Sequence, residues 1–157
     1  MNTNTKTSER NWMALALCAV LASTAVANAQ DNKPEGELKV QVQNIQSDKG
    51  QIGCSLWQDD EGFPSDSEDA LESLFIKPKG KKATCVFKNV KPGTYAVSVM
   101  HDIDNDGELD SSLVGRPKEP WAVSNNAPAE RFGPPKFDAA KFSYSGASST
   151  IQVKLTL

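Results

Sequence analysis

The stretch Leu38-Lys39-Val40-Gln41-Val42-Gln43 alternates an apolar and a polar residue at every step. Successive side chains of a β-strand point to opposite faces, so this period of two places every apolar residue on one face. The same period recurs at residues 52–56, 83–87, 95–101 and 151–157. The pattern predicts an all-β fold: a single antiparallel β-sandwich of about seven strands, Ig-like or prealbumin-like.

Turn-forming residues separate the predicted strands. Asp48-Lys49-Gly50, Lys91-Pro92-Gly93-Thr94 and Ser145-Gly146 each come just before one of them, and these residue types favour tight turns. One short helix is predicted over residues 65–74, with a cap supplied by Ser65 or Asp66. One long loop is predicted from Leu113 to Lys136, where prolines and glycines replace any periodic pattern and Trp121 and Phe132 favour packing.

The N-terminus has the features of a cleavable signal peptide. Lys6 and Arg10 precede an apolar run at residues 12–26, and Ala27-Asn28-Ala29 supplies the small residues that signal peptidase requires. The alternative is an uncleaved anchor, but the run is shorter than the roughly 20 residues that span a bilayer. We therefore expect residues 1–29 to be removed after Ala29 and residues 30–157 to form one periplasmic or secreted domain.

The charge of the chain limits the classes of partner. The formal net charge of −3 becomes −4 when residues 1–29 are removed, because that segment carries two basic residues and one acidic residue. No basic stripe is present in residues 30–157. These features argue against nucleic acid and anionic membranes as partners, and no stable membrane insertion is expected after cleavage.

Cys54 and Cys85 are the two cysteines that remain after residue 29. An exported protein meets an oxidising compartment, so we expect a disulfide between them. Both cysteines fall on the apolar face of their predicted strands, which suits a bond in the core. The alternative is a pair of unbonded buried thiols.

An acidic loop follows the strand predicted at residues 95–101. Carboxylates at alternate positions followed by Gly107 reproduce the start of an EF-hand-type calcium loop, although Leu113 stands where a bidentate Glu belongs. Water, Ser111 or Glu119 would have to complete the shell. The alternative is that the Asp and Asn side chains only form local turns. The candidate Ca²⁺ ligands are Asp102, Asp104, Asp106, Glu108 and Asp110.

A second candidate surface combines aromatic and polar side chains for a sugar or a peptide. The tryptophans could offer a flat face, whereas the alternative is that both cover the core. The partner of such a surface would be a glycan or an envelope protein. The candidate binding residues are Trp57, Trp121, Asn125, Asn126 and Arg131.

Catalysis is not expected. His101 is the only histidine, so a zinc site built on several imidazoles is impossible, and no Gly-x-Ser-x-Gly elbow exposes a serine nucleophile. His101 shares a face with Val97 and Val99, which favours a core-facing structural role. A hydrolase that uses carboxylates of the acidic loop is the remaining enzymatic alternative, but carboxylates that bind a cation are poor proton donors.

The chain contains several ordered motifs, at residues 51–64, 89–97, 101–110, 115–119, 124–126, 132–135 and 137–140. Together they resemble the bacterial domain of unknown function 2141 (DUF2141) family. The resemblance implies an exported single domain of unestablished activity and brings no catalytic residues. The Pro92-Gly93-Thr94-Tyr95 turn is also similar to turns of prealbumin-like and carboxypeptidase-regulatory-like sandwiches, which are mostly accessory or binding modules.

Overall fold

The computed structural model describes residue 1, residues 35–113 and residues 115–157. The predicted signal peptide and its cleavage site after Ala29 lie outside these residues, apart from Met1. Within the described part of the chain, no helix is long and apolar enough to cross a membrane.

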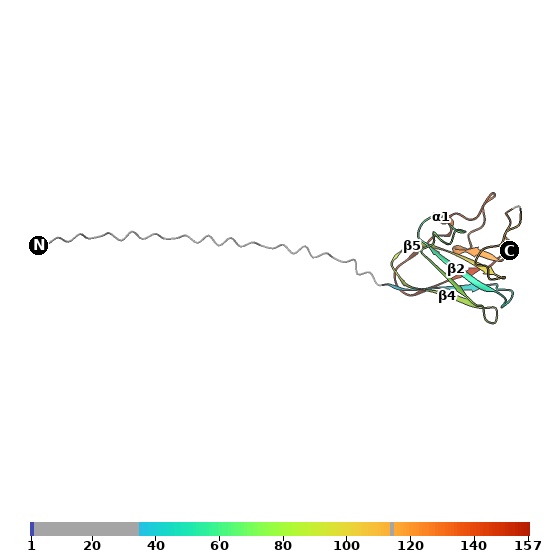
Figure 1. Cartoon of the computed structure of the whole chain (residues 1–157), viewed down its shortest axis with the longest axis horizontal. Helices are drawn as coiled ribbons and strands as arrows, with labels where there is room; N and C mark the ends of the chain where they lie inside the picture. The colour runs from blue at the N-terminus through green and yellow to red at the C-terminus, as the bar shows by residue number, and fades with distance from the viewer. Residues whose placement is uncertain (2–34, 114) are drawn as a thin grey trace. The chain divides into compact units, whose positions relative to one another are not determined.

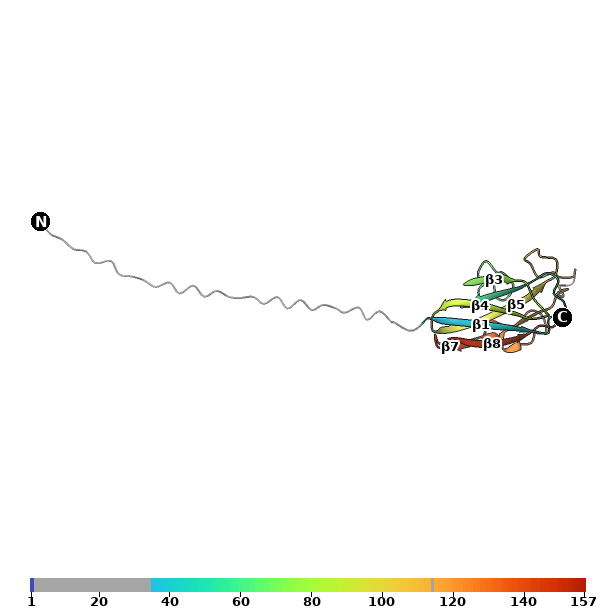
Figure 2. The same cartoon turned by 90° about the horizontal axis from the view of Figure 1, so that it is seen from below.

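Strands dominate the described residues, and two short helical turns lie between the later strands (Figures 1 and 2). In chain order, the elements are β1 (Gly36–Gln43), β2 (Gln51–Trp57), β3 (Glu72–Ile76), β4 (Ala83–Val90), β5 (Gly93–Asp102), β6 (Trp121–Val123), η1 (Ser124–Asn126), α1 (Phe137–Ala140), β7 (Phe142–Tyr144) and β8 (Ser149–Lys154).

The strands form two sheets that pack into a sandwich. One sheet has the order β4-β1-β8, and the other has the order β3-β2-β5-β6, with β7 also paired to β5. This arrangement confirms the all-β sandwich, while an Ig-like or prealbumin-like topology stays a prediction. The expectation of purely antiparallel pairing is wrong for one pair, because β1 and β8 run parallel, with Val40 opposite Ile151. Figure 2 shows β1 between β4 and β8.

The core contains the apolar residues that the period of two predicts. Leu38 and Val40 of β1, Cys85 and Phe87 of β4, and Val153 of β8 are completely buried. They pack in one cluster with the inward residues of the opposite sheet, which include Ile52, Leu56, Val97 and Val99. Each fully buried aliphatic side chain contributes about 1.5–3 kcal/mol, so alternation in the sequence directly drives the stacking of the sheets.

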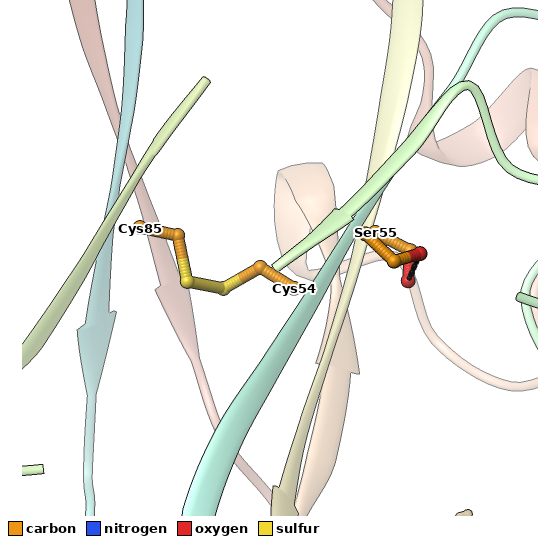
Figure 3. The surroundings of a disulfide bond; sticks show 4 residues. Cys54, Ser55 and Cys85 are labelled. Atoms are coloured by element: carbon orange, nitrogen blue, oxygen red, sulfur yellow. Dashed lines mark hydrogen bonds between the residues drawn. A yellow bond between two sulfur atoms is a disulfide. The ribbon is translucent and has the colours of Figure 1, made fainter. Parts of the chain in front are cut away.

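The disulfide is present and joins the two sheets (Figure 3). Cys54 of β2 and Cys85 of β4 lie with their Cα atoms 6.5 Å apart and are separated by 31 residues in the chain. Both side chains are buried. The predicted pairing is therefore confirmed, and the bond ties the sheets together through the core.

Two local predictions are corrected by the structure. The helix predicted at residues 65–74 does not form: the chain turns there and then enters β3, where Leu74 pairs with Cys54 and Ile76 with Ile52. The stretch from Leu113 to Lys136 is not a continuous loop either, because it contains β6 and η1. In both places, pairing with a neighbouring strand decides the conformation, and a local pattern cannot reveal such pairing.

Candidate functional site

The acidic loop begins at Asp102, the last residue of β5, which is completely buried. Its Oδ2 accepts hydrogen bonds from Gln51 Nε2 at 2.7 Å and from the Gly107 N–H at 2.9 Å, and its Oδ1 accepts one from the Asn105 N–H at 2.7 Å. Burial acts to raise the pKa of Asp102, but hydrogen bonds from Gln51, Gly107, Asn105 and Asp106 outweigh it and hold the pKa below its ordinary value. Asp102 is therefore a buried anion around which the loop folds.

The backbone of the loop turns sharply at two residues. Asn105 has a φ of 66° and Gly107 has a φ of 86°, a left-handed conformation that Asn and Gly adopt more readily than other residues. Between them, Asp106 Oδ1 accepts a hydrogen bond from the Glu108 N–H at 2.8 Å. These turns bring the alternate carboxylates of the loop to the same side.

Three of the five predicted metal ligands come together. Oxygen atoms of Asp102, Asp104 and Asp106 all lie within 4.8 Å of one another, and the last two side chains are exposed. Glu108 and Asp110 are also exposed but are not members of this cluster. The arrangement brings three carboxylates together at the rim of the five-stranded sheet.

Glu119 lies at the base of the acidic loop, where the sequence indicates it only as one of the groups that could complete a Ca²⁺ shell. It is buried, with 5 % of its surface exposed. Its Oε1 accepts a hydrogen bond from the Ile103 N–H at 2.7 Å, and its Oε2 accepts one from the Asp110 N–H at 3.2 Å. Glu119 therefore holds both ends of the loop through hydrogen bonds. It lies nine residues after Asp110 in the sequence, so no local pattern indicates this role.

His101 is buried on the inner face of β5, as its position in the alternation predicts. Its Nε2 lies 2.8 Å from the carbonyl oxygen of Lys49, a contact in which a protonated Nε2 donates. Its backbone N–H donates to the carbonyl of Pro120 at 2.8 Å. The imidazole thus connects the end of β5 to the turn before β2.

Trp57 is not available as a ligand platform, because only 1 % of its surface is exposed. The loop after β2 folds back over the indole, placing Phe63 edge-on at 5.5 Å between ring centroids. The indole Nε1–H donates to Ser98 Oγ at 2.9 Å. The core-covering alternative therefore holds for Trp57, whereas Trp121 is only half-buried.

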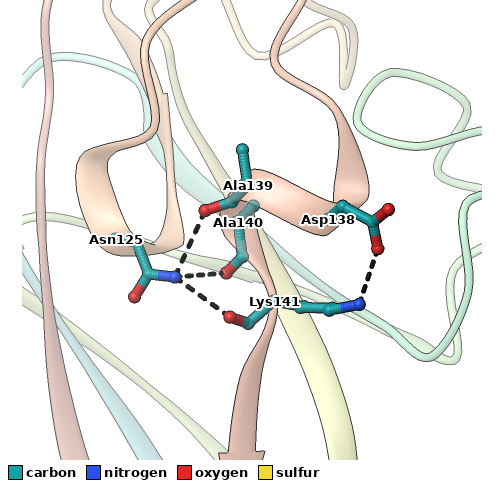
Figure 4. A network of polar contacts seen from close by, with 5 residues as sticks. All are labelled: Asn125, Asp138, Ala139, Ala140 and Lys141. Carbon is teal, nitrogen blue, oxygen red and sulfur yellow. Dashed lines mark hydrogen bonds and ion pairs between the residues drawn. The ribbon is translucent and has the colours of Figure 1, made fainter.

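The predicted binding asparagines make structural contacts. Asn125 Nδ2 donates to the carbonyl oxygens of Ala139, Ala140 and Lys141 at 3.3, 3.1 and 3.0 Å (Figure 4). Asn126 Oδ1 accepts a hydrogen bond from the Lys154 N–H at 2.8 Å. These contacts join η1 to α1 and to β8. Arg131 is exposed, with its guanidinium 5.3 Å from the centroid of the Phe132 ring; Phe132 is itself 90 % exposed and so does not pack on the core as expected.

Together, these features define the class: a disulfide-linked β-sandwich that carries an aspartate-rich loop at one end of its five-stranded sheet. The chain belongs to DUF2141, a family described as uncharacterized protein conserved in bacteria, which it matches over residues 40–152. This match confirms the resemblance drawn from the sequence motifs. Neither the curated proteins nor the solved structures include a significant match to the chain.

Proposed function

We propose that the protein is a noncatalytic, exported β-sandwich whose loop at residues 102–110 binds one Ca²⁺ ion. The proposal rests on the mutual distance of at most 4.8 Å between oxygen atoms of Asp102, Asp104 and Asp106. Ca²⁺ binds oxygen at about 2.3–2.6 Å, so two ligands of the same ion lie no more than about 5 Å apart. The separation of the three carboxylates meets that limit.

The remaining ligands of the ion would come from the same loop and from solvent. Ca²⁺ takes about six to eight oxygen ligands, and the carbonyl of Glu108 and water are the candidates for completing its shell. Because Asp104 and Asp106 are exposed and both acidic, their mutual repulsion weakens the metal-free loop, and a bound cation removes it. The role of the metal is thus to stabilise the rim of the sheet.

The noncatalytic part of the proposal is supported by the surroundings of His101. Its ring is 1 % exposed and its Nε2 is engaged with the Lys49 carbonyl, so it has no access to a substrate. The signal peptide predicted at residues 1–29 supports a periplasmic or secreted location.

The test is calorimetric titration with CaCl₂ of the protein recovered after export and stripped with EGTA. We expect one site in the wild type and at least a tenfold loss of affinity for Asp104→Asn combined with Asp106→Asn, since two charged ligands become neutral. Asp59→Asn combined with Asp60→Asn removes the same charge from another exposed loop and should leave affinity unchanged. Equal binding by both double variants, or no heat in the wild type, would contradict the proposal.

A further inference from the structure

The outer face of the five-stranded sheet is only half covered. Near the end of β2, Trp57 packs with Ala96, Val123 and Ala140 in a small second core beneath the loops that follow β2 and η1. Farther along β2 and β5, the outward residues are Gly53, Ser55, Ser98 and Met100, which line a groove.

The groove has a volume of about 830 Å³, and Trp121 of β6 also lines it. Its sides come from residues 64–68, 107–109, 111, 115 and 133–134. Gly53 keeps its floor low: a Cβ there would lie 3.0 Å from both Met100 Cε and Phe75 Cε1. A volume of roughly 300–1,000 Å³ is typical of sites that hold a small molecule or a few residues of a peptide.

The charged side chains that line the groove are all acidic. They are Asp66, Glu68 and Glu108, and no Lys, Arg or His is among the described lining residues. None of the ion pairs between described residues uses these three carboxylates. The loop at residues 58–71, which supplies Asp66 and Glu68, contains six acidic residues and no basic one. The groove is therefore complementary to a cation.

The floor of the groove combines apolar side chains with hydroxyl groups, and this limits which cation fits. The half-buried ring of Trp121 and the thioether of Met100 offer surface to an aliphatic stem or a guanidinium plane. Ser98 Oγ accepts the hydrogen bond of Trp57, so its own O–H remains free to donate to a ligand carbonyl. A cation, an apolar stem and a carbonyl acceptor occur together in a peptide that contains Lys or Arg.

We propose that this groove binds a short basic peptide segment of a partner protein. An Arg or Lys side chain lies over Trp121 and Met100 with its charge toward Glu68 and Glu108, and the peptide backbone accepts from Ser98. The groove uses the side chain of Glu108, whose carbonyl oxygen is a candidate calcium ligand, but it does not include the carboxylates of Asp102, Asp104 and Asp106 and does not require a metal ion.

The test is fluorescence anisotropy in EGTA with a dye-labelled pentapeptide of alternating arginine and glycine. We expect it to bind, and a peptide with glutamate in place of arginine not to bind. Glu68→Gln combined with Glu108→Gln should raise the Kd about fivefold to tenfold, and Trp121→Phe about threefold. Both glutamates are exposed, so their substitution leaves the fold intact.

The matched control is Glu35→Gln combined with Glu37→Gln, which removes the same charge at the start of β1 in the other sheet and should change the Kd less than twofold. An equal effect of the two double variants would show attraction to net charge alone and overturn the assignment. Competition by spermidine as effective as that by unlabelled peptide would overturn the peptide as ligand. Loss of peptide binding does not affect the calcium proposal, which titration with CaCl₂ tests separately.

Discussion

Replacement of Asp102 by Asn tests whether the acidic loop is organised by a buried anion. The amide must place its NH₂ group where one carboxylate oxygen now accepts hydrogen bonds. At Oδ2 it would face the donors of Gln51 and Gly107, and at Oδ1 the donor of Asn105. A hydrogen bond to a charged group is worth about 1.5–3 kcal/mol, and a buried donor left without a partner costs about 1–3 kcal/mol. We expect Asp102→Asn to lower the free energy of unfolding by about 3 kcal/mol.

The assay is thermal unfolding followed by circular dichroism in EGTA, which excludes any contribution of Ca²⁺. For a domain of roughly 120 residues, about 3 kcal/mol corresponds to a fall in Tm of about 12 °C. Asp104→Asn is the control: its side chain is exposed, so in EGTA its Tm should change by less than about 2 °C. A fall of less than 3 °C for Asp102→Asn would refute the reasoning.

The same pair of proteins gives a pH dependence with a defined sign. The folded pKa of Asp102 is lowered, so its stabilising contribution is complete above the unfolded value of about 3.9 and is lost as the pH falls through the folded pKa. The difference in stability between wild type and Asp102→Asn should therefore stay constant from about pH 5 to pH 8 and shrink below about pH 4.

Two further predictions concern the scaffold. The bond between Cys54 and Cys85 closes a loop of 31 residues. Its reduction should lower the free energy of unfolding by about 3.7 kcal/mol in the chain-entropy estimate and the Tm by about 15 °C. An equal Tm for the wild type with and without reductant would contradict this prediction. Asn125→Ala should lower the stability to urea by about 2 kcal/mol, because it removes the amide contacts to the 139–141 carbonyls and puts Ala, which tolerates left-handed backbone less well than Asn, at a φ of 60°. Asn125→Gly also removes the amide, but Gly adopts a positive φ readily, so this variant should lose less stability than Asn125→Ala. An equal loss of stability in the two variants would contradict the contribution assigned to the backbone conformation.

The long strands could be predicted because apolar and polar residues alternate visibly along their sequences. Along most of β1 and β8, more buried residues alternate with exposed ones. In β5 every second residue from Tyr95 to His101 is buried, although Ala96 and Asp102 on the other face are buried as well. β3, β6 and β7 are three to five residues long, too short for a pattern, and they are strands only because a neighbouring strand offers hydrogen-bonding groups. The parallel pairing of β1 with β8 is likewise a property of two distant segments.

The candidate site could likewise be predicted only where its residues lie close together in the sequence. The spacing of Asp102, Asp104 and Asp106 is local information, and the structure brings these three together. The contributions of Gln51 and Glu119 come from segments remote in sequence, and only the fold places them at the loop. Residue type alone makes Trp57 a candidate for binding a sugar or a peptide. The loop that buries it folds back through tertiary packing, which no local sequence pattern reveals.

The position of β1 between β4 and β8 makes residues 149–154 a condition for completing that sheet. Without residues 149–154 in place, β1 has one edge of unpaired amide and carbonyl groups, which is a template for pairing with another chain. A variant that lacks residues 149–154 would therefore be aggregation-prone even with its disulfide intact, because the bond between Cys54 and Cys85 does not cover that edge.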